Sequence, residues 1–199
     1  MKHRYLTLGL LLFLAGCMGS PPPVPRDHYY RIVVPLPAAQ SGETLLPGVV
    51  SVAPLDADGL LRERPLLYSL SQNGNEVRQY DYYYWTDSPT RMLQSQMVAY
   101  LQRSGLARSV VTPALQVSAD YEVKGRIKRF ERLLGDGPPR VVAELDLALV
   151  ALDDSRLVVN GSYAAEIDSA DDSMDAAVDA LNEALAAILD QFLANAARG

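Results

Sequence analysis

Few residues in this sequence have the chemistry of a catalyst. The chain contains one cysteine, Cys17, and two histidines, His3 and His28. Nucleophilic catalysis needs a serine or cysteine side chain beside a histidine base. The sequence has no G-x-S-x-G motif, which would position a serine for this role. His28 is better interpreted as an exposed residue at the start of a strand. We therefore expect no enzymatic activity, and a hydrolase is the least favoured function.

The acidic residues could bind a metal ion only if enough oxygen ligands met at one point. The segment Asp56-Ala57-Asp58-Gly59 is similar to a fragment of a calcium loop, but it lacks the ligand number and loop length of calcium sites and is interpreted as a turn. A second group precedes the last predicted helix, where negative charge complements a helix N-terminus; it comprises Asp168, Asp171, Asp172 and Asp175. No glycine-rich phosphate loop is present. The sequence predicts neither a metal nor a cofactor.

Cys17 is the residue whose surroundings indicate a specific chemistry. A basic start and an apolar run over residues 6–15 precede it, as in a signal peptide, and the run is too short to span a bilayer of about 30 Å. Leu14-Ala15-Gly16-Cys17 resembles the lipobox of bacterial lipoproteins, in which the cysteine takes a diacylglycerol and an N-acyl chain. The alternative is an ordinary secretory signal with an incidental cysteine. A lone free thiol would be a liability in an oxidising compartment. We therefore predict a signal peptide at residues 1–16 and lipid attachment at Cys17.

The residues after Cys17 indicate where the protein is held. Aspartate directly after the cysteine typically retains a Gram-negative lipoprotein in the inner membrane, whereas this chain has Met18. The outer membrane is therefore the favoured site of the anchor. Residues 17–27 contain four prolines and are interpreted as an extended tether. The folded domain is expected at residues 28–199.

The composition restricts the partners of this domain. With 49% hydrophobic and 21% charged residues the chain is ordinary for a globular protein. Its net charge is −6, and loss of Lys2 and Arg4 with the signal peptide makes it more negative. A nucleic-acid partner needs a basic surface, and anionic lipid headgroups would repel an acidic one. Neither is an expected partner of the domain.

The periodicity of apolar residues predicts the secondary structure. Ser88 before Pro89 and the later Gly105 delimit one helix, and Ser173 begins a second helix with an unbroken apolar stripe up to Phe192. A turn at Gln72-Asn73-Gly74-Asn75 predicts a hairpin. Strands are expected at residues 29–34, 49–53, 60–70 with an interruption at Pro65, 76–85, 109–112, 121–128, 141–152 and 157–167.

The order of these elements, β-β-β-β-α-β-β-β-β-α, predicts the fold class. Consecutive long strands near the end of the chain suggest an antiparallel meander, and each apolar helix stripe must be covered. We expect a single α+β domain in which two helices cover one face of a mostly antiparallel sheet.

One short segment is unusually aromatic. It holds four of the eleven tyrosines and the only tryptophan: Tyr80, Tyr82, Tyr83, Tyr84 and Trp85. Strand alternation would place Tyr80, Tyr82 and Tyr84 on one face and Tyr83 and Trp85 on the other. One set would then be core, while the other packs under a loop or forms a protein interface or a lipid contact.

Two segments resemble the ABC-type transport auxiliary lipoproteins, of the PqiC and YmbA kind. They are residues 60–68 (LLRERPLLY) and residues 82–93 (YYYWTDSPTRML). The lipobox, the length and the order of elements agree as well, from about Tyr29 to Ala194. In many relatives an arginine precedes the tryptophan, where this chain has Tyr84.

The resemblance implies a non-catalytic, periplasm-facing accessory of a lipid transport system. Such systems pair an ATPase and a permease with an MCE-domain protein that carries lipid between the two membranes. Aromatic and arginine residues dominate interface energies, so the candidate residues for docking on the MCE protein are Arg64, Tyr82, Tyr83, Tyr84 and Trp85. A periplasmic lipid-binding shuttle with an apolar cavity is the alternative, and self-association is left open.

Overall fold

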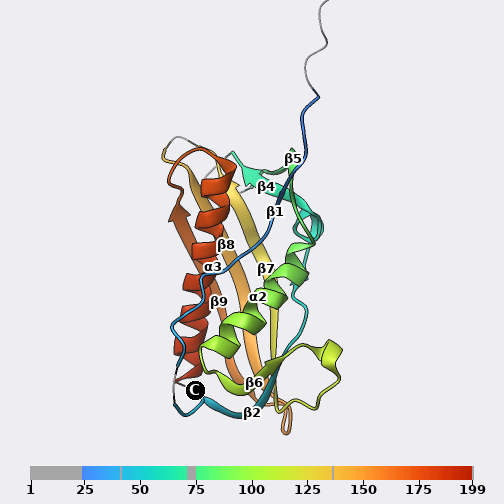
Figure 1. Ribbon diagram of the computed structural model, residues 1–199, viewed down its shortest axis with the longest axis vertical. Coiled ribbons are helices and arrows are strands. Elements are labelled where there is room, and N and C mark those ends of the chain that lie inside the picture. The colour runs from blue at the N-terminus through green and yellow to red at the C-terminus, as the bar shows by residue number, and fades with distance from the viewer. Residues whose placement is uncertain (1–23, 41, 71–74, 136, 199) are drawn as a thin grey trace, which may run out of the picture.

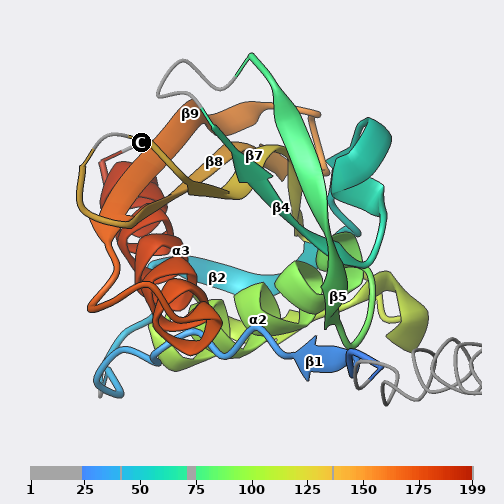
Figure 2. The same cartoon turned by 90° about the horizontal axis from the view of Figure 1, so that it is seen from above.

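The computed structural model describes residues 24–40, 42–70, 75–135 and 137–198 as one domain. The strands are β1 (His28–Tyr30), β2 (Leu46–Val52), β3 (Asp56–Ala57), β4 (Pro65–Ser69), β5 (Val77–Trp85), β6 (Ala107–Val111), β7 (Tyr121–Leu133), β8 (Arg140–Ala151) and β9 (Leu157–Asp168). The helices are α2 (Pro89–Arg103) and α3 (Met174–Ala196), with short 3-10 turns η2 (Gly59–Arg62) and η3 (Pro113–Leu115). Both long helices lie on the same side of β7, β8 and β9 (Figures 1 and 2). The predicted single α+β domain with two helices is confirmed.

Strand β7 organises the sheet. Along one edge it pairs antiparallel with β8, which pairs antiparallel with β9. Along its other edge it pairs in turn with β2, β3 and β4, each parallel to it over two or three residues. The long ladders are therefore antiparallel as expected, while the short parallel pairs make the sheet a mixed one.

The expected first strand over residues 29–34 is shorter in the structure. Strand β1 ends at Tyr30 and pairs parallel with β5. Residues 31–40 then cross over the helix pair (Figure 1), with the Val33 amide donating to Asn182 Oδ1 at 2.9 Å and the Val34 amide donating to Gln96 Oε1 at 3.0 Å. The alternating apolar residues Ile32 and Val34 were the pattern that predicted a strand here. They are buried against the helices and not in a sheet. We call residues 31–34 the strap.

The region around Pro65 also differs from the expected continuous strand. Residues 59–62 form the 3-10 turn η2, and the strand β4 begins only at Pro65. The predicted hairpin is confirmed, because β4 and β5 pair antiparallel. Its predicted turn lies outside the described residues except for Asn75.

Helix α2 begins and ends where its flanking residues predict, and helix α3 begins at its predicted cap. Helix α2 follows Ser88 with Pro89 in its first turn, and Gly105 after its end has a φ of +70°, which glycine adopts without strain. At the start of α3, the Ser173 hydroxyl accepts a hydrogen bond from the Ala176 amide at 3.1 Å. Such a cap stabilises a helix by roughly 1 kcal/mol.

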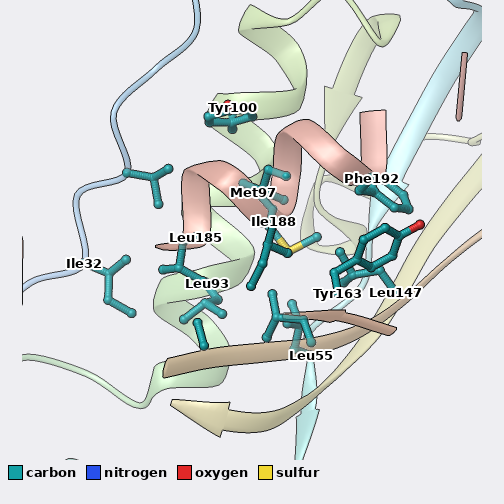
Figure 3. Close-up of a cluster of buried hydrophobic side chains, with 14 of the residues drawn as sticks. Ile32, Leu55, Leu93, Met97, Tyr100, Leu147, Tyr163, Leu185, Ile188 and Phe192 are labelled. Atoms are coloured by element: carbon teal, nitrogen blue, oxygen red, sulfur yellow. The ribbon is translucent and has the colours of Figure 1, made fainter. Parts of the chain in front are cut away.

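The core lies between the helices and the long strands (Figure 3). Leu93 and Met97 of α2 meet Leu185 and Ile188 of α3, and the strap adds Ile32. On the sheet side, the rings of Tyr163 and Phe192 pack edge to face with their centroids 5.9 Å apart. The apolar stripe of α3 is thus covered by other side chains.

Candidate functional site

The aromatic segment of β5 is covered along one edge by β1. The parallel register places His28 beside Tyr83, Tyr29 beside Tyr84 and Tyr30 beside Trp85. Aromatic rings therefore lie on both faces of a two-strand ribbon. The two faces have different surroundings.

Trp85 belongs to the core. Its side chain is 2% exposed, and its indole stacks on the Phe130 ring of β7 at 5.4 Å. Its backbone amide donates to the Arg64 carbonyl at 2.7 Å. A side chain buried to this degree cannot contact a partner, so Trp85 is removed from the predicted docking residues.

An inner row of rings continues from Trp85 along the same face. Tyr83 stacks on His28 at 5.2 Å and meets Tyr80 edge to face at 5.5 Å, and Tyr80 lies 4.6 Å from Tyr68. The prediction that Tyr80 shares a face with Tyr82 and Tyr84 was wrong, because Tyr80 contacts Tyr83. The cause is a register shift between β4 and β5, in which Pro65 pairs with Tyr84 but Leu67 pairs with Gln79. The additional residues on β5 reverse its alternation.

The outer face carries what we call the outer aromatic surface, made of Tyr29, Tyr82, Tyr84 and Arg64. Tyr29 stacks on Tyr84 at 5.7 Å, and the Arg64 guanidinium lies 5.5 Å from the centre of the Tyr29 ring. Arg64 Nε also donates to the Trp85 carbonyl at 3.0 Å, which fixes the guanidinium beside the rings. Tyr29 is 56% exposed and Tyr82 is 42% exposed. Of the predicted docking residues, Arg64 and Tyr82 are therefore exposed and are joined by Tyr29, while Tyr83 and Tyr84 are partly buried.

Tyr30 and Tyr84, at this end of the domain, both have a raised pKa. Burial, together with the carboxylate of Asp175, raises the pKa of Tyr30 to about 12. Partial burial and the neighbouring Asp27 carboxylate raise the pKa of Tyr84 as well. Near neutral pH these rings therefore present uncharged hydroxyl groups.

The other sequence candidates have structural explanations. The turn predicted at residues 56–59 is instead the strand β3 followed by the start of η2. Its carboxylates form ion pairs, Asp56 with Arg62 and Arg126, and Asp58 with Arg126 at 3.0 Å. Ahead of α3, the Asp171 carboxylate accepts from the Ser173 amide and Asp172 pairs with Arg132. Among the described residues, no three metal-ligating side chains gather into a metal site.

Cys17 and the signal peptide lie outside the described residues. Neither long helix of the described chain has a stretch long and apolar enough to cross a membrane. His28 is exposed, as predicted, and stacks on Tyr83.

Sequence reasoning missed two buried polar features. Asn182 is 7% exposed and interrupts the apolar stripe of α3, where it binds the strap. Glu131 is 3% exposed and pairs with Arg129 at 2.7 Å. A polar residue inside an apolar helix stripe was a signal for the first, since a buried amide needs a hydrogen-bond partner. Glu131 was missed because charged residues alternate along β7, and this alternation predicts exposed charged side chains.

Comparison with known proteins places the fold among lipoproteins. The family model described as ABC-type transport auxiliary lipoprotein component matches residues 30–192. The structure of protein XCC0632 from Xanthomonas campestris superposes with a TM-score of 0.72 at 19% identity, covering 83% of this chain and 92% of that one. A second, uncharacterised protein gives a TM-score of 0.66 at 19% identity, covering 87% and 98%. No curated protein matched the chain.

Proposed function

The chain belongs to the ABC-type transport auxiliary lipoprotein family, and from this premise we propose that it is the non-catalytic accessory subunit of a lipid transporter working between the inner and outer membranes. Membership makes the protein a membrane-anchored lipoprotein that faces the periplasm and assists a transport system. The lipid cargo, the MCE-domain partner and the outer-membrane site are our proposal. The single observation that carries it is the family match, which extends over almost all of the described domain.

The proposed anchor is the lipid on Cys17. A diacylglycerol with an additional N-acyl chain exceeds the two signals that stable membrane attachment requires, at roughly 0.8 kcal/mol for each buried CH₂. The proline-rich tether then separates the anchor from β1. Met18 in place of aspartate supports the outer membrane as the site.

The anchor is tested by replacing its only thiol. Cys17→Ala should abolish labelling by a fatty-acid analogue and leave an unprocessed precursor or a mislocalised protein. Met18→Asp tests whether residue 18 directs the protein to the outer membrane. This variant should still be labelled by the fatty-acid analogue but should be found in the inner membrane. Labelling that persists in Cys17→Ala contradicts the assignment.

The proposed partner is the MCE-domain protein of the transporter. Full-length lipoprotein with a C-terminal affinity tag, purified from detergent-extracted membranes of its own host, should co-purify with an MCE-domain protein, a permease and an ATPase. Recovery of the lipoprotein without any of the three contradicts the proposal.

The alternative of a lipid shuttle depended on the apolar stripe of α3 lining a cavity. In the structure this stripe packs against β8 and β9, with Phe192 fully buried against Tyr163. That packing favours the accessory role over the shuttle. Lipid co-purifying in stoichiometric amount with the isolated lipoprotein would reverse this preference.

A further inference from the structure

The outer aromatic surface lies where the chain enters the domain. Tyr29 belongs to β1, the first strand, and the described chain reaches it from Val24 at the end of the molecule formed by β4 and β5 (Figure 1). Cys17 precedes Tyr29 by twelve residues. Even fully extended, that length of chain spans no more than about 40 Å. A lipid on Cys17 would therefore keep Tyr29 within about 40 Å of the bilayer surface.

The side chains at this end suit the boundary between water and lipid. A tyrosine ring combines an apolar body with a hydroxyl group, and tyrosine is enriched at the headgroup level of membranes. The rings of Tyr29, Tyr82 and Tyr84 meet these conditions, and the fixed Arg64 guanidinium can reach a phosphate. The exposed apolar residues at the opposite end, Leu115 and Val117, are aliphatic and lack such a polar tip.

The charges around the surface indicate which lipids it would contact. The carboxylates of Asp27 and Asp81 lie near Tyr84, that of Asp87 lies near Arg64, and the Tyr29 hydroxyl donates to Asp27 at 3.3 Å. With no net positive charge, the surface has no attraction for anionic headgroups, which a basic cluster would provide. Contact would instead depend on the rings, so zwitterionic headgroups are the matching partner.

We propose that the outer aromatic surface rests on the headgroup region of the membrane that holds the lipid anchor. The domain is then oriented with β4 and β5 at the membrane and with β2, β6 and η3 pointing into the periplasm (Figure 1). This inference rests on the proposed function only for the anchor at Cys17. Docking of a protein on the same surface is the competing outcome.

The test reads the tyrosines directly by hydroxyl-radical footprinting. The processed, lipidated chain is reconstituted in phosphatidylcholine vesicles and recovered by flotation. The same chain with Cys17→Ala, exported through an ordinary secretory signal, supplies the level in solution. Oxidation of Tyr29, Tyr82 and Tyr84 should fall by about fivefold or more on the vesicles, because rings seated among headgroups are withdrawn from water. Oxidation of exposed Leu115 should not change, and buried Tyr100 should stay unreactive in both samples.

A matched pair of charged variants tests the same surface. Tyr82→Asp places a carboxylate among the rings and should return Tyr29 and Tyr84 to the oxidation level measured in solution. Leu115→Asp alters the opposite end and should leave them protected. Adding phosphatidylglycerol to the vesicles should not increase the protection.

The outcomes separate this inference from the proposed function. A chain that floats while its three tyrosines stay fully reactive overturns the membrane-facing surface and leaves the anchor intact. A chain that does not float overturns the anchor and the orientation that depends on it. Protection that develops only when purified MCE-domain protein is added shows that the surface binds protein, which also overturns the inference.

Discussion

The domain contains two regions that use aromatic residues in opposite ways. Around β7, β8, β9 and α3, long antiparallel ladders and a long apolar helix stripe enclose rings such as Tyr163 and Phe192. Around β1 and β5, a three-residue parallel pairing and a register shift hold rings on both faces of a ribbon. The first region buries its rings to build a core. The second keeps Tyr29, Tyr82 and Tyr84 on its outer face, where they contribute little to the core and are available for contacts.

The boundary between the two regions lies at Trp85. Its indole stacks on Phe130 of the long sheet, while its neighbour Tyr84 stacks outward on Tyr29. Adjacent residues of one strand thus differ in role because they lie on opposite faces. Substitutions on the two sides of this boundary should therefore differ in their effect on stability.

The largest loss of stability is expected for a substitution of Trp85, the boundary residue. Trp85→Ala should lower the free energy of unfolding by about 3–5 kcal/mol, because it removes a large, fully buried ring and leaves a cavity. Chemical denaturation measures this loss. A loss below about 1 kcal/mol would place Trp85 with the surface rings and abolish the boundary.

A smaller effect is expected where the strap crosses onto the helices. Asn182→Ala should cost about 1–3 kcal/mol, because the Val33 amide loses its acceptor in a partly buried setting. Hydrogen exchange at Val33 and Val34 should accelerate as well. Asp179→Ala, on the exposed face of the same helix, is the control and should change neither quantity. Unchanged exchange in Asn182→Ala would mean that the strap is held by its apolar side chains alone.

Alkaline pH should lower the free energy of unfolding through ionisation of Tyr30, which lies beside Trp85 in the register of β1 and β5. An unfolded tyrosine ionises near pH 10.0, whereas burial and Asp175 raise the pKa of Tyr30 to about 12 in the folded protein. The stability from keeping this hydroxyl neutral is therefore complete below pH 10.0 and is lost as the pH rises towards about 12. Tyr30→Phe should reduce that loss, as measured by denaturation midpoints across this range, while Tyr82→Phe should not. Equal losses in both variants would contradict the role of Tyr30.

The smallest effect on stability is expected at the outer aromatic surface. Tyr82→Ala should change the free energy of unfolding by no more than about 0.5 kcal/mol, because its side chain is 42% exposed and lies outside the core cluster. Denaturation of Tyr82→Ala and Trp85→Ala in parallel gives the sharpest comparison. If both variants lose similar stability, the ribbon of β1 and β5 is part of the core on both faces.

Much of this molecule could be predicted from local patterns. Ser88, Pro89 and Gly105 delimit α2, the Ser173 cap starts α3, and the apolar periodicity located β7, β8 and β9. Such features depend on residues close in the sequence, through capping, turn chemistry and the repeat of apolar side chains. The motif ending in Cys17 is local in the same sense, and its lipid attachment stays a prediction.

The outer aromatic surface could not be predicted from local patterns, because it forms through contacts between distant segments. Only the pairing of β1 with β5 brings Tyr29 onto Tyr84, and only the register shift opposite Pro65 moves Tyr80 to the inner face. The partner of a three-residue parallel strand has no local signal, and one shift of register reverses every later side chain. The sequence alone therefore determined that aromatic residues gather near Trp85. The tertiary structure decided which of them are core and which face outward, because burial depends on what the rest of the chain places against each face.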